Sequence, residues 1–237
     1  MTNYELLKTA FEFKESSCTI ISDRKQGIEI AKSSIKSNYI LLENYIKDHP
    51  KFLHSLTPII VEDGPKVVRL MAKASLKTNV GPMAAVAGVI ADLAVIDMTN
   101  IGCKVAVVED GGEISAYSNQ PIDIAFVAGN ESLSKKLGFR LNQFPIGVAT
   151  SSGRFSHALS FGDAEAVTIF AINAGLADAT ATAVANMIKG ENVREVIRQG
   201  IDKGLSIDGI KGIFILYHNV VGKAGQIADL IKINSEE

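Results

Sequence analysis

A carboxylate and a hydroxyl stand four residues apart in the stretch GLADATATAVANMI, residues 175–188, which otherwise consists mainly of small and apolar residues. Positions i and i+4 of an α-helix lie on one face, so the side chains of Asp178 and Thr182 can point at one target. A structural alternative stays open. Asp178 can be a first-turn or capping acid, and Thr182 can bond back to a main-chain carbonyl.

Two earlier stretches combine glycines with residues that can meet a charged ligand. TNVGPMAAVAG contains a Gly-Pro helix start at Gly81, whose free N–H groups can receive an anion; Gly-Pro is also a common way to begin any helix. VVEDGGEI places Glu109, Asp110 and Glu113 around Gly111 and Gly112. Asp-Gly is a frequent turn pair, so a plain hairpin turn is the alternative.

The stretch VATSSGRFSHALSFGD is rich in hydroxyl groups and also carries a cation and a histidine. Short side chains beside a glycine let main-chain amides approach a polar ligand, and Arg and His bind phosphate oxygens. The residues concerned are Thr150, Ser151, Ser152, Gly153, Arg154, Ser156, His157 and Ser160. A Ser-His hydrolase is disfavoured because no Gly-x-Ser-x-Gly elbow is present. A solvated polar loop is the competing interpretation.

Composition limits the class of protein. The 237 residues carry a net charge of −2 and no basic patch, which argues against nucleic-acid binding. Cys18 and Cys103 are isolated, so neither a zinc site nor a disulfide framework is expected, and a reducing cytoplasm fits best. The first residues lack the pattern of a secretory signal. MAAVAGVIADLAVI, residues 83–96, is interrupted by Asp92 and too short to span a bilayer, so we expect a buried helix and no membrane partner.

Strand and helix patterns alternate irregularly along the chain. Helical spacing predicts helices over 26–48, in two segments within 65–98, over 175–188 and over 192–203. Strands are expected at 18–21, after the linker within FLHSLTPIIVEDG, on both sides of Gly111-Gly112, and in IDIAFVAG, FPIGVATSSG, AEAVTIFAI and IKGIFILYHNVVG. We therefore expect an α+β fold: a single domain over 1–237 with a mixed or antiparallel sheet flanked by helices.

Four of these stretches, in this order, resemble the ApbE superfamily, whose best-known members are FAD:protein FMN transferases. That family has a glycine-led helix, a D-x-G-G-E/N-I turn, an A-T-S-G loop followed by a His, and an A-D-A-L-A-T-A helix. The chain has VGPMAAVAG, EDGGEI, VATSSG with His157, and LADATATAV. The resemblance covers residues 78–190, with 1–77 as a preceding strand and helix portion, and the chain looks most similar to a small uncharacterised prokaryotic branch.

The resemblance implies roles for individual residues. In the family the helix Asp and the Thr four residues later help to hold a magnesium ion that bridges the FAD diphosphate, so Asp178 and Thr182 are the candidate metal ligands. Magnesium prefers hard oxygen ligands and needs few carboxylates when phosphates supply the rest. His157 and Asp178 are the candidate catalytic residues. The candidate cofactor-binding residues are Gly81, Asp110, Gly111, Gly112, Glu113, Thr150, Ser151, Ser152, Gly153 and Arg154.

The chain departs from the transferases at two motifs. SHALSFGDAEAV has no D-P-x-T-G loop after the His, and GPMAAVAG stands where the family has Lys-Gly-Tyr. Flavin binding is therefore implied more directly than transfer of FMN to a protein threonine.

Three functions follow from these observations. The first is a soluble, cytoplasmic, magnesium-dependent enzyme that acts on FAD or a related nucleotide by transfer or cleavage at the diphosphate. The second is a noncatalytic flavin- or nucleotide-binding protein, and the third is a structural or complex-forming protein without a ligand. The sequence leaves open a homo-oligomer and a protein acceptor.

Overall fold

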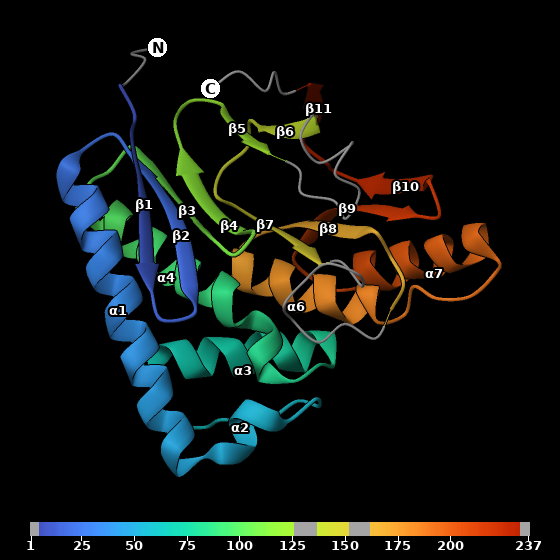
Figure 1. Ribbon diagram of the computed structural model, residues 1–237, viewed down its shortest axis with the longest axis horizontal. Coiled ribbons are helices and arrows are strands. Elements are labelled where there is room, and N and C mark those ends of the chain that lie inside the picture. The colour runs from blue at the N-terminus through green and yellow to red at the C-terminus, as the bar shows by residue number, and fades with distance from the viewer. Residues whose placement is uncertain (1–4, 126–136, 152–161, 233–237) are drawn as a thin grey trace.

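The computed structural model describes residues 5–125, 137–151 and 162–232, and its central element is an eight-stranded antiparallel sheet with the order β1-β2-β3-β4-β7-β8-β9-β10 (Figure 1). Residues 103–170 supply the middle of this sheet, while the first and last segments of the described chain supply its edges. The strands are β1 Leu7–Phe13, β2 Ser16–Ser22, β3 Val105–Asp110, β4 Glu113–Ser118, β7 Ile146–Ser151, β8 Ala166–Ala171, β9 Ile210–Tyr217 and β10 Val220–Gly225.

Helices cover one face of this sheet. Figure 1 shows α1 crossing beside β1 and β2, and α6 and α7 lying beneath β7, β8 and β9. The helices are α1 Lys25–Asp48, α2 Pro50–His54, α3 Lys66–Thr78, α4 Val86–Asn100, α6 Ala174–Ala185 and α7 Val193–Leu205, with the 3-10 turn η1 Pro82–Ala85 in front of α4. Helices α1, α4, α6 and α7 contact strands of the sheet, whereas α2 and α3 pack against other helices.

A second, three-stranded sheet covers the opposite face. It has the order β11-β6-β5, formed by Asp229–Lys232, Leu137–Leu141 and Ile122–Ala125. Phe139 is buried between the sheets, where its ring meets those of Phe170 and Phe214 edge-on. The middle strands β3 and β8 are therefore buried on both faces, and polar side chains on them are the exception.

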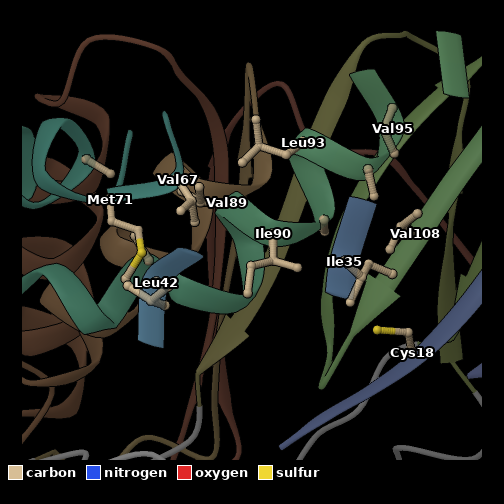
Figure 2. Close-up of a cluster of buried hydrophobic side chains, with 14 of the residues drawn as sticks. Cys18, Ile35, Leu42, Val67, Met71, Val89, Ile90, Leu93, Val95 and Val108 are labelled. Carbon is tan, nitrogen blue, oxygen red and sulfur yellow. The ribbon is translucent and has the colours of Figure 1, made fainter. Parts of the chain in front are cut away.

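The largest apolar cluster lies between the large sheet and helices α1, α3 and α4. Figure 2 shows Ile35, Met71, Ile90, Leu93 and their neighbours converging from these elements. The run Pro82–Asn100 is long and apolar enough to cross a membrane, but 56% of its most apolar window is buried inside the protein. This is the behaviour of a core helix, as the sequence predicted.

The α+β architecture and the long helices agree with the sequence analysis, and several short elements differ from it. The strand expected within FLHSLTPIIVEDG is absent; the stretch forms the end of α2 and then an irregular segment over 55–65. The last predicted strand is a hairpin of two strands, β9 and β10, turning at His218 and Asn219 with φ of 48° and 60°. Strands β1, β6 and β11 were not predicted, because their alternation is weak or they are short.

Candidate functional site

The turn between β3 and β4 presents two carboxylates to the helices. Gly111 and Gly112 have φ of 66° and 111°, values that favour glycine and allow a tight two-residue connection. Asp110 and Glu113 are therefore directly paired across the hairpin and share one sheet face. This is the helix-covered face, because Val108, two residues before Asp110, packs in the cluster of Figure 2.

Asp110 is buried and held in place by β2. Its Oδ2 accepts a hydrogen bond from the Ser16 hydroxyl at 2.9 Å. Burial is the main cause that raises the pKa of Asp110, while hydrogen bonds from Ser16 and Cys18 work in the opposite direction. The hydrogen bond from Ser16 thus fixes the Asp110 carboxylate on the same sheet face as Glu113.

Asp178 lies in the second turn of α6, and its carboxylate reaches the start of α4. Its Oδ2 accepts a hydrogen bond from the main-chain N–H of Gly88 at 3.1 Å. The first turn of α6 contains no acidic residue, and the cap of this helix is Asn173, whose side chain accepts from the N–H of Leu176. The alternative of a first-turn or capping acid for its own helix is therefore wrong. Asp178 instead bonds one of the N–H groups that a helix start leaves without an intrahelical partner.

Thr182 follows one turn later on α6 and is partly buried, like Asp178. Among the residues that the structure describes, its hydroxyl makes no hydrogen bond, so the alternative of a bond back to a main-chain carbonyl is not observed. The hydroxyl is therefore available to a ligand beside the Asp178 carboxylate.

Negative charge is concentrated around Asp178. Burial raises the pKa of Asp178 to about 8, with the nearby charges of Asp110 and Asp92 acting in the same direction against the hydrogen bond from Gly88. Burial also raises the pKa of Glu113, and Asp178 and Asp110 raise it further. Carboxylates placed this close favour either a proton or a bound cation.

Asp92 of α4 explains how these elements are held together. Its Oδ1 accepts from the Ser115 hydroxyl at 2.7 Å and from the N–H of Ala174 at 2.9 Å, and its Oδ2 accepts from the N–H of Gly175 at 2.9 Å. A single buried side chain thus joins α4, β4 and the start of α6. Sequence analysis treated Asp92 only as an interruption of an apolar run, although a carboxylate inside such a helix needs several partners.

Gly88 is the second residue that sequence analysis missed. A Cβ at this position would lie 2.4 Å from the carbonyl oxygen of Ala174, so only glycine permits this approach of α4 to α6. The close approach brings the N–H of Gly88 to Asp178.

The other predicted site residues do not all lie beside Asp178. Gly81 precedes η1, which packs against α6, and a Cβ on Gly81 would overlap the carbonyl oxygen of Ser55, so close packing accounts for the glycine. The Thr150 hydroxyl is 2.9 Å from that of Thr168 on the sheet face away from the helices, whereas Ser151 has the opposite orientation at the end of β7. Ser152, Gly153, Arg154 and His157 lie outside the described residues.

The donor set fits a hard cation that receives part of its coordination from a ligand. In the described part of the chain, no three His, Cys, Asp or Glu side chains are grouped closely enough to hold a metal ion together. The carboxylate of Asp178 and the hydroxyl of Thr182 offer only oxygen, which is the preference of Mg²⁺, and phosphate oxygens commonly complete its shell.

Comparisons with known proteins agree with this architecture. Residues 8–205 match the family model described as AbpE bacteria. A UPF0280 protein of Methanocaldococcus jannaschii is 40% identical over 224 residues, covering 92% of this chain and 91% of the relative, and one of Methanococcus maripaludis strain C7 is 38% identical over 229 residues, covering 94% and 92%.

Solved structures share the fold at low identity. The flavinyl transferase ApbE of Pseudomonas stutzeri, in its apo form, has a TM-score of 0.61 at 16% identity, covering 95% of this chain and 96% of that one. The ApbE protein of Thermotoga maritima has a TM-score of 0.57 at 13% identity, covering 93% and 97%.

Proposed function

Since the chain belongs to the AbpE bacteria family and shares the fold of flavinyl transferases, we propose that it is a magnesium-dependent enzyme acting on FAD or a related nucleotide diphosphate. One observation carries the proposal: Asp178 of α6 meets the start of α4 through Gly88 and lies in the same group of charges as Asp110 and Glu113 of the β3–β4 turn. Three segments that are far apart along the chain, namely the start of α4, the β3–β4 turn and α6, thereby contribute to one candidate site around Asp178.

The proposed reaction is a displacement at the phosphorus of the FMN half of FAD. An acceptor oxygen forms a new P–O bond to this phosphorus while the bond to the bridging oxygen breaks, and AMP leaves with that oxygen. The acceptor proton passes to a base. Water as acceptor gives FMN and AMP, and a hydroxyl group as acceptor gives its FMN ester and AMP. No redox change is involved.

The chain's residues have distinct parts in this proposal. Asp178 and Thr182 bind the cation together with main-chain carbonyls, and Gly88 orients the Asp178 carboxylate through its N–H. Glu113, whose raised pKa favours its protonated form, can donate a hydrogen bond to a phosphate oxygen or share its proton. Ser151 ends β7 on the same face and leads into the segment with His157, the proposed base. Bound Mg²⁺ supplies charge neutralisation for the phosphate oxygens.

A product assay tests this proposal. Purified protein is incubated with FAD in Mg²⁺ or in EDTA, and AMP and FMN are quantified by chromatography. We expect equimolar products only with Mg²⁺, and loss of both in Asp178→Asn. Asp202→Asn, which changes an exposed carboxylate on α7, is the matched control and retains activity. FAD binding without AMP release contradicts an enzyme and favours a binding protein, while absence of binding contradicts both.

A further inference from the structure

A cavity near the start of α6 is lined by none of the residues assigned to the nucleotide. It occupies about 360 Å³ between α3, α4, β4, the beginning of β7 and the start of α6. Asp110, Glu113, Asp178 and Thr182 do not line it. Its volume is at the lower end of the roughly 300–1,000 Å³ typical of ligand pockets. The cavity therefore suits a compact ligand.

The walls of this cavity are mostly apolar. Val89 and Val95 come from α4, Ile146 from β7 and Leu176 from α6, and all four are buried. Ile96 lines the same cavity but is 39% exposed, so it lies toward the opening. An occupant needs an apolar body to replace water against these side chains.

Lysines on α3 supply the positive charge of the lining. Lys77 is already engaged, since its Nζ is 3.0 Å from Oδ2 of Asp208. Lys73 is exposed and forms no ion pair within residues 5–125, 137–151 and 162–232. Its stem can lie along the apolar wall while its ammonium group remains at the opening. Lys73 thus offers a positive charge that no ion pair with a described residue neutralises.

Most other polar groups of the lining already have hydrogen-bond partners. The N–H groups of Ala174 and Gly175 donate to Asp92, and that of Leu176 donates to Asn173, so the start of α6 has no donor left for a ligand among these three. Asp92 carries three hydrogen bonds and faces the positive end of the helix dipole. Lys73 is therefore the charged group that can recognise an acidic function here, with the side-chain amide of Asn173 in the same lining.

We propose that this cavity binds a small monocarboxylate with an apolar body, its acid group paired with Lys73 and its body against Val95, Ile96 and Leu176. One free cation matches one negative charge, and the apolar walls favour an aromatic or branched aliphatic body over a sugar or a nucleotide. The proposal does not rest on the proposed nucleotide chemistry, whose residues do not line this cavity.

Calorimetry with phenylacetate as the probe tests the proposal, and phenylacetamide serves as its uncharged analogue. We expect phenylacetate to bind at least about fivefold more tightly than the amide, since a charge-assisted contact contributes more than a neutral one. Lys73→Met removes the charge and keeps the stem, and it should abolish this preference. Lys66→Met, on the same helix but outside the cavity, should preserve it.

Ile96→Trp places a larger side chain at the opening and should remove binding of both probes, while Asp178→Asn should leave both unchanged. The proposal is overturned if neither probe binds at millimolar concentration, if acid and amide bind equally, or if Lys73→Met or Ile96→Trp behaves as the wild type. Phenyl phosphate binding more tightly than phenylacetate also overturns it and indicates a phosphate site. If the protein does not turn over FAD but still binds phenylacetate, the proposed function fails and this site stands.

Discussion

The N–H of Gly88 on α4 donates to Oδ2 of Asp178 on α6 at 3.1 Å. A contact in the opposite sense lies one helical turn away, through Asp92. Asp92 of α4 accepts from the N–H of Ala174 and Gly175 at the start of α6. Each helix thus supplies a carboxylate to the other's first turn. The pair of helices is fixed by two reciprocal contacts, of which only the one through Asp178 lies in the candidate site.

Asp92 is expected to be the structural member of this pair. Asp92→Ala leaves two N–H groups and the Ser115 hydroxyl without their acceptor, which should cost roughly 3 kcal/mol or more in the free energy of unfolding. Asp92→Asn keeps an acceptor oxygen and should cost less. Urea denaturation followed by circular dichroism measures both, with Asp202→Asn as the control. A change below about 0.5 kcal/mol for Asp92→Ala would contradict this role.

Gly88 should not tolerate a methyl group. Gly88→Ala places a Cβ 2.4 Å from a main-chain oxygen that cannot move aside, and about 1–3 kcal/mol of stability should be lost despite the better helix propensity of alanine. Gly204→Ala on α7 is the matched control, because its new Cβ meets only side-chain atoms, the nearest being the terminal Cδ1 of Ile213 at 2.8 Å. Thermal unfolding of the two variants should therefore differ clearly. Equal melting temperatures would show that the helices can separate at little cost.

Two threonines on α6, Thr182 and Thr180, should differ in their effect on FAD binding. Thr182→Val should weaken Mg²⁺-dependent FAD binding severalfold, since a methyl group cannot ligate a cation. Thr180→Val should leave binding unchanged and keep or raise stability, because the Thr180 hydroxyl is fully buried and has no hydrogen-bond partner among the described residues. Calorimetric titration and thermal unfolding test the pair. Equal binding by both variants would remove Thr182 from the site.

The stability of the metal-free protein should fall as pH rises. Asp178 has its pKa raised to about 8 in the folded state, whereas an unfolded aspartate titrates near 4. The folded state binds more protons between these values, so the favourable contribution is complete below about pH 4 and is lost as pH rises through about 8. Denaturation curves from pH 5 to 9 in EDTA should show this loss, reduced in Asp178→Asn. A rise in stability over this range, or an identical slope in the variant, would contradict the raised pKa.

Local sequence signals predicted much of the fold. The small and apolar residues of 175–188 predicted the helix α6, and two glycines identified the β3–β4 turn, because helix patterns and tight turns depend on neighbouring residues. Asp178 and Thr182 could be paired by helical spacing. The contacts of Gly88 with Asp178 and of Asp92 with the start of α6 could not be predicted, since the partners lie more than 80 residues apart. The orientation of Thr150 follows from strand alternation, which the sequence analysis did not apply to that loop.

Titration of FAD by calorimetry tests the central claim most directly. Wild type, Asp178→Asn and Asp202→Asn are each titrated in Mg²⁺ and in EDTA, with circular dichroism to establish that the variants fold. The account predicts tight binding only with Mg²⁺, lost in Asp178→Asn and kept in Asp202→Asn, because a neutral amide is a poor ligand for a hard cation. Equal FAD affinity in wild type and folded Asp178→Asn, with or without Mg²⁺, would contradict it.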